Sequence, residues 1–100
     1  MVFCKELFLG VENSEEIIEL LGQGKAVFDV YLLCVPQRGE NLLHIISTYE
    51  ALKEINTYCD YVVIGMAQGK EKAIELASEV LKQWLDTHKN TGGFKKYYIG

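Results

Sequence analysis

Long apolar runs, prolines and secretory features are all scarce in this 100-residue chain. No window approaches the roughly 20 consecutive apolar residues of a membrane helix. The first residues, MVFCKELFLG, lack the basic start and the small-residue cleavage site of a secretory signal. A single proline and an apolar fraction of 49% are typical of a globular protein and not of a disordered tail. We therefore expect one domain over residues 1–100, cytoplasmic and without a membrane partner.

Cysteine is sparse and shows no functional spacing. Cys4, Cys34 and Cys59 lie far apart in apolar surroundings, and the chain has neither a CxxC pair nor the Cys/His spacing of a zinc site. We predict reduced thiols in the core, which suit a reducing compartment. We predict no metal and no cofactor.

Positive charge is in the minority, with 10 Lys and Arg residues against 14 Asp and Glu residues. The resulting field repels nucleic acid and anionic lipid, so we predict no nucleic-acid partner. One segment, FKKYYI at 94–99, sets basic beside aromatic residues. We interpret it as an edge strand with solvated lysines and not as an RNA contact.

Catalytic motifs such as HExxH, GxSxG, an EF-hand loop or paired carboxylates are missing from the sequence. The stretch nearest to a motif is YVVIGMAQGKEKA at 61–73. A Walker loop needs four residues between its glycines and Ser or Thr after its lysine. Here three residues separate Gly65 from Gly69, and Glu71 follows Lys70. We interpret the stretch as a strand-to-helix joint, with a weak anion site at Gly65, Gly69 and Lys70 as the alternative.

Hydrophobic periodicity predicts alternating strands and helices joined by short loops. The order is strand, helix, strand, strand, helix, strand, helix, strand, over 3–9, 13–22, 26–35, 42–48, 49–55, 61–66, 70–88 and 94–99. The first six elements follow the βαββαβ order of a ferredoxin-like fold. We therefore predict an α+β, two-layer sandwich with a mixed sheet, helices mostly on one face, and an added C-terminal helix and strand.

The turn PQRGEN at 36–41 predicts a hairpin. If it closes symmetrically, Val35 opposes Leu42, Leu33 opposes His44 and Tyr31 opposes Ile46. One face is then almost wholly apolar and carries Phe28, Val30, Leu32, Cys34, Leu43 and Ile45. The other is amphipathic and carries Asp29, Tyr31, Leu33, His44, Ile46 and Thr48. We expect this second face to be open, because it is too apolar for free solvent exposure and too polar for a dry core.

Three functions remain open, and no stretch resembles a known family closely enough to choose among them. The first is a small interaction or regulatory module that forms a homodimer through Tyr31, Leu33, Ile46 and Thr48. The second is a module that binds a small anion or a phosphorylated metabolite, using Gly65, Gly69 and Lys70 or a pocket lined by Asp29, Tyr31 and His44. The third is an enzyme in which Asp29 orients His44, although we assign no catalytic residue.

Overall fold

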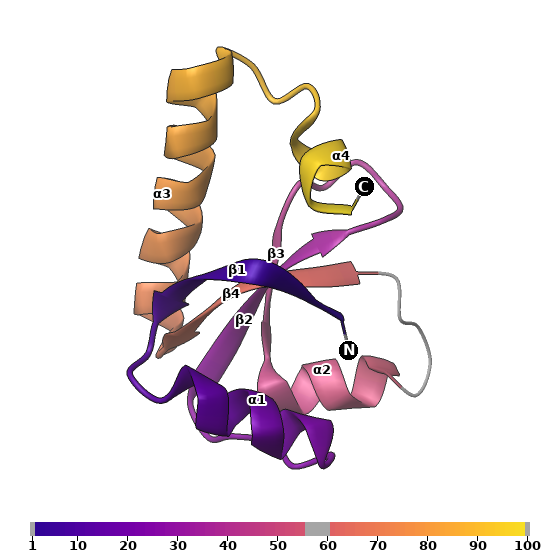
Figure 1. Cartoon of the computed structure of the whole chain (residues 1–100), viewed down its shortest axis with the longest axis vertical. Helices are drawn as coiled ribbons and strands as arrows, with labels where there is room; N and C mark the ends of the chain where they lie inside the picture. Colours follow the sequence, from indigo (N-terminus) through magenta and orange to yellow (C-terminus); the bar gives the residue numbers. More distant parts are fainter. Residues whose placement is uncertain (1, 56–60, 100) are drawn as a thin grey trace.

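The part of the chain that the structure describes folds into four strands and four helices (Figure 1). The computed structural model describes residues 2–55 and 61–99, so the prediction for Cys59 lies outside the described residues. The elements in chain order are β1 (Val2–Gly10), α1 (Ser14–Gly22), β2 (Val30–Pro36), β3 (His44–Ser47), α2 (Thr48–Ile55), β4 (Tyr61–Gln68), α3 (Lys70–His88) and α4 (Phe94–Ile99). The first seven elements are of the predicted types, and the bounds of α3 are those predicted.

The strands form one mixed sheet in the order β1-β4-β2-β3. β1 runs parallel to β4, whereas β2 is antiparallel to both β4 and β3. The predicted α+β class and mixed sheet are therefore confirmed. The ferredoxin-like arrangement is not confirmed, because the strand order differs and the helices are interleaved between the strands.

Helices cover both faces of the sheet: Figure 1 shows α1 and α2 on its lower side and α3 and α4 on its upper side. Two separate buried clusters correspond to these sides. One joins the central strands to Ile17, Leu21 and Ala51 of α1 and α2. The other joins them to α3 and to Phe94 of α4. The expectation of a two-layer sandwich was wrong, because β2 and β4 are apolar on both faces and each face needs its own cover.

The β2–β3 hairpin is shifted by one residue from the predicted pairing. Leu33 lies opposite Ile45, and Cys34 lies opposite His44. A shift of one residue moves every side chain of β3 to the other face. The predicted start of β2 was also too early, because Asp29 adopts a left-handed conformation (φ 57°) that interrupts an extended strand. Phe28, which was expected to point inward, is 81% exposed.

The C-terminal segment 94–99 is a helix and not the predicted edge strand. In a helix, residues three and four apart share a side, so Phe94, Tyr97 and Tyr98 can pack together. The ring of Phe94 is fully buried and lies 5.0 Å from that of Tyr98. The aromatic residues favoured a strand by local preference, but this packing overrides the preference.

The edge strand β1 is irregular where it meets β4. The pairing advances from Phe3 to Phe8 on β1 while it advances only from Val63 to Gly65 on β4. The extra residues form a bulge, which bends an edge strand and changes the direction of its side chains. Gly65 permits the close approach of the two strands after the bulge, because a Cβ there would lie 2.8 Å from the carbonyl oxygen of Phe8.

Candidate functional site

A concave surface lies between β1, the second half of α3, and α4. It consists of two adjoining hollows of about 180 and 190 Å³. Both are lined by Phe8, Tyr97 and Tyr98, so together they form one continuous feature, which we call the β1–α4 groove. The groove therefore joins side chains from the two ends of the chain.

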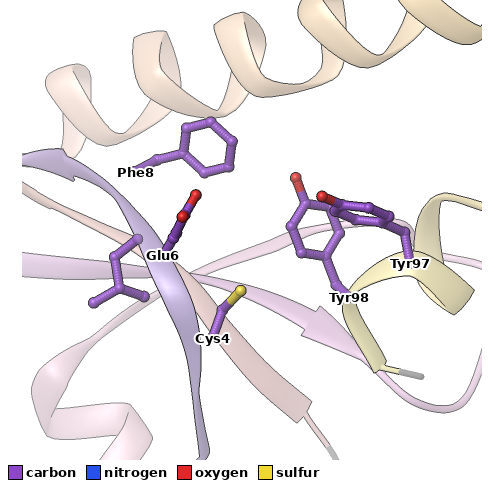
Figure 2. Close-up of a pocket in the computed structure, with 6 residues that line it drawn as sticks. Cys4, Glu6, Phe8, Tyr97 and Tyr98 are labelled. Atoms are coloured by element: carbon purple, nitrogen blue, oxygen red, sulfur yellow. The ribbon is translucent and has the colours of Figure 1, made fainter.

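The first hollow combines polar and aromatic side chains. It is lined by Cys4, Glu6, Leu7, Phe8, Tyr97 and Tyr98. Figure 2 shows Cys4, Glu6 and Phe8 on β1 facing the two tyrosines of α4. Strand geometry explains this arrangement, because every second residue of a strand faces the same side. A thiol, a carboxylate and two phenols thus share one small space.

The second hollow lies along α3 and is built around the single tryptophan of the chain. The indole of Trp84 is stacked on His88, with ring centroids 3.6 Å apart, and Phe94 meets it edge-on at 5.4 Å. Its Nε1–H donates to the carbonyl oxygen of Asn90 at 3.0 Å. These contacts hold the indole in one orientation, so it forms a fixed wall of the groove.

Tyr98 is the group in the groove whose ionisation is clearly perturbed. Its pKa is raised above the ordinary value, first because burial disfavours the phenolate and then because Tyr97 and Cys4 lie nearby. The phenol therefore stays neutral at physiological pH. It can both donate and accept a hydrogen bond towards a ligand.

The structure brings together two groups that the sequence had assigned to different sites. The backbone N–H of Gly69, just before α3, donates to the carbonyl oxygen of Asp29 at 2.7 Å. The side chain of Gln68 donates to the Asp29 carboxylate at 3.4 Å. Gly69 has φ +86°, a conformation that favours glycine. The backbone hydrogen bond between Gly69 and Asp29 links the residue before β2 to the residue after β4. It leaves the Asp29 carboxylate near the start of α3, where an anion would have to bind.

A broad hollow of about 460 Å³ surrounds this helix start. Lys70 and Lys72 line it, but so do Glu71 and Glu75. The two lysines are therefore balanced by two carboxylates, before Asp29 is considered. Gly65 lies inside β4, away from the residues that line this hollow, and serves the close approach to Phe8. The anion site predicted from this stretch has little net positive charge to support it.

The predicted interface residues are divided between different environments. Leu33 is fully buried beneath α3 and α4, and Ile46 is half-buried against the opposite core. Thr48 is fully buried, where its hydroxyl accepts from the N–H of Val27 at 2.8 Å and donates to its carbonyl at 2.6 Å. Tyr31 is half-buried on the side of Leu33. The open sheet face on which the dimer prediction depended is thus covered within the chain.

His44 and Asp29 are too far apart to act together. His44 lies opposite Cys34, and Asp29 precedes that position by five residues along the chain. At about 3.3 Å per residue, this corresponds to roughly 15 Å. A direct hydrogen bond between the two side chains is out of reach, so the third function lacks its required geometry.

The groove is suited to binding more than to covalent chemistry. Its first hollow sets the Cys4 thiol beside a carboxylate and phenols, and none of the described residues that line it is a Lys, Arg or His that would activate a thiol. Within 2–55 and 61–99, no three His, Cys, Asp or Glu side chains are grouped as a metal site. In the same ranges, no helix is long and apolar enough to cross a bilayer.

Comparisons with known proteins return no match for the chain. No family model, no curated protein and no solved structure is found to be similar.

The sequence reasoning missed Glu6, Phe8, Trp84 and Tyr98 as a group. One signal was present in β1, where the exposed Glu6 alternates with Cys4 and Phe8, two residues that pack against the core beneath α3 and α4. A charged residue within such an alternation departs from the usual apolar pattern. The sequence has no comparable signal that Trp84 and α4 line the groove, because their place in the groove depends on how the C-terminal segment folds back.

Proposed function

We propose that this chain is a small binding module whose ligand site is the β1–α4 groove. The observation that supports the proposal is the convergence of Glu6, Phe8, Tyr97 and Tyr98 on one small hollow. Ligand sites typically combine apolar and aromatic walls with a few polar groups that fix orientation. The first hollow has this composition.

The size of the groove sets the scale of the ligand. Each hollow is smaller than the roughly 300 Å³ at which pockets for drug-sized ligands begin. The groove therefore suits a small molecule or a single protruding side chain of a partner. Tyr97 is 70% exposed, so an aromatic ring is already available at the rim. Such rings often anchor recognition because they bury a large area at little cost in conformational entropy.

The alternative anion-binding function has one supporting observation, the open hollow that contains Lys70 and Lys72. It is weaker, because carboxylates compete at the same helix start. Titration with inorganic phosphate separates the two proposals. Binding at α3 would shift the backbone amide resonances of Gly69 and Lys70 and would leave Tyr97 and Tyr98 unchanged.

The main test is a fragment titration followed by amide chemical shifts and by the fluorescence of Trp84, the single tryptophan. Binding in the groove should shift Phe8, Tyr97 and Tyr98 together. Tyr97→Ala should weaken binding by about tenfold, as expected for removal of an aromatic anchor. The matched control is Tyr49→Ala, because Tyr49 is also exposed, at 53%, but lies on α2 beneath the other sheet face.

Two outcomes of the fragment titration would contradict the proposal. If a fragment set of mixed charge shifts no resonance of the groove, the groove is not a ligand site. The same conclusion follows if Tyr97→Ala and Tyr49→Ala weaken binding equally, because the aromatic rim would then have no specific role.

A further inference from the structure

The first hollow of the groove contains an acidic side chain and no described basic one. Among the described residues that line it, Glu6 is the acidic residue, and no Lys, Arg or His is among them. The carboxylate is solvent-exposed and is directed towards the Phe8 ring in Figure 2, on the strand that faces Tyr97 and Tyr98 across the hollow. An anionic ligand would be repelled there, whereas a cation would be attracted.

The aromatic walls strengthen this preference. The rings of Tyr97 and Tyr98 lie nearly perpendicular, at 85° and 4.9 Å between centroids. Together with Phe8 they offer ring surfaces in different orientations around one space. The face of an aromatic ring is electron-rich and attracts a cation placed over it. A carboxylate combined with several rings is the chemistry by which proteins recognise substituted ammonium groups.

The lining also distinguishes among cations. A metal ion requires several oxygen, nitrogen or thiolate ligands, and the described residues contain no such cluster. An unmodified ammonium group has three N–H donors that need acceptors. Methyl groups on the nitrogen remove donors and match a carbon-rich wall such as Phe8.

We propose, resting on the binding function above, that the first hollow binds a methylated ammonium group paired with the Glu6 carboxylate and packed against Phe8, Tyr97 and Tyr98. Such a group occurs both in free small molecules and on methylated lysine side chains. The hollow of about 180 Å³ accommodates the head group and leaves the rest of either ligand at its open rim.

The test compares choline with 3,3-dimethyl-1-butanol, which has nearly the same shape but no charge, by chemical-shift titration of the folded chain. Choline should bind at least about tenfold more tightly, and its affinity should fall as salt is added, because Glu6 is exposed to screening. Glu6→Gln should weaken choline binding by about two- to fivefold and leave the neutral compound unaffected. Glu12→Gln, a change at another exposed carboxylate, should alter neither.

The outcomes separate this inference from the function on which it rests. If the neutral compound shifts the groove resonances as strongly as choline, the charge inference is wrong while groove binding stands. If Glu6→Gln leaves choline affinity unchanged, the assigned carboxylate is wrong. If choline shifts nothing in the groove but other fragments do, the cation inference alone fails. A parallel titration with a trimethyl-lysine peptide distinguishes the two sources, because tighter binding than choline indicates a protein partner.

Discussion

Replacing Gly65 by alanine tests whether this glycine serves packing or ligand binding. An added Cβ would lie 2.8 Å from the carbonyl oxygen of Phe8, 3.2 Å from its Cβ and 3.5 Å from Cδ2 of Leu33. The nearest atom belongs to the backbone of β1, so it cannot move away by changing a rotamer. The strand itself must shift, and with it the Phe8 ring that lines both hollows of the groove.

The magnitude follows from two opposing terms. Overpacking of this kind costs about 1–3 kcal/mol, whereas alanine gains about 0.5–1 kcal/mol over glycine within a strand because it loses less backbone entropy. Taking the middle of each range, the net loss in the free energy of unfolding is about 1.3 kcal/mol. For a domain of this size the melting temperature should fall by roughly 5–10 °C.

The assay is thermal unfolding of Gly65→Ala beside Gly22→Ala. A Cβ at Gly22, the last residue of α1, would meet nothing within 4 Å. The melting temperature of Gly22→Ala should stay the same or rise slightly, because alanine is a better helix former than glycine. If both variants melt within about 2 °C of the parent chain, the close approach of β1 and β4 does not require a glycine at position 65.

Three further predictions concern stability, ionisation and assembly. Thr48→Val removes both hydrogen bonds to Val27, so the free energy of unfolding should fall by about 1.5–3 kcal/mol in chemical denaturation; an unchanged midpoint would contradict this. The raised pKa of Tyr98 means that its stabilising effect is complete below about pH 10 and is lost as pH rises through the folded-state value. Tyr98→Phe should therefore remove a phenol that titrates late in absorbance and make alkaline unfolding less steep; loss of an early-titrating phenol would refute it. Self-association stays a prediction, now through the β1 edge, whose outer side has no strand partner in the sheet; sedimentation equilibrium should show a dimer at high micromolar concentration, and a monomer there excludes it.

Periodicity predicted most of the fold because the buried faces of the elements are regular. Ala73, Ala77 and Val80 recur at helical spacing and lie in the core beneath α3. Val62, Val63 and Ile64 form a continuous apolar run, and β4 is buried on both faces. The same run also contained the evidence against a two-layer sandwich, because a strand with one open face would alternate instead.

The hairpin register could not be read from the turn sequence alone. The symmetric closure of PQRGEN assumed that β3 begins at Leu42, but it begins at His44. A longer connection of odd length changes which residues of β3 face which helix layer. As a result, His44 and Ile46 lie on the side of Cys34 and Leu32, and not with Tyr31.

The groove escaped sequence reasoning because its two walls are about ninety residues apart in the chain. The two walls meet because the chain turns back after α3, at the glycines at 92 and 93. This turn places α4 across the first hollow from β1. When β1 is considered alone, Glu6 is only a charged residue that interrupts an apolar strand. With α4 in place, the same departure from alternation puts one carboxylate among aromatic rings on the face turned to Tyr97 and Tyr98. A charge that alternates with core-packed strand residues, together with the two tyrosines at 97 and 98, is therefore the sequence feature from which this site could be predicted.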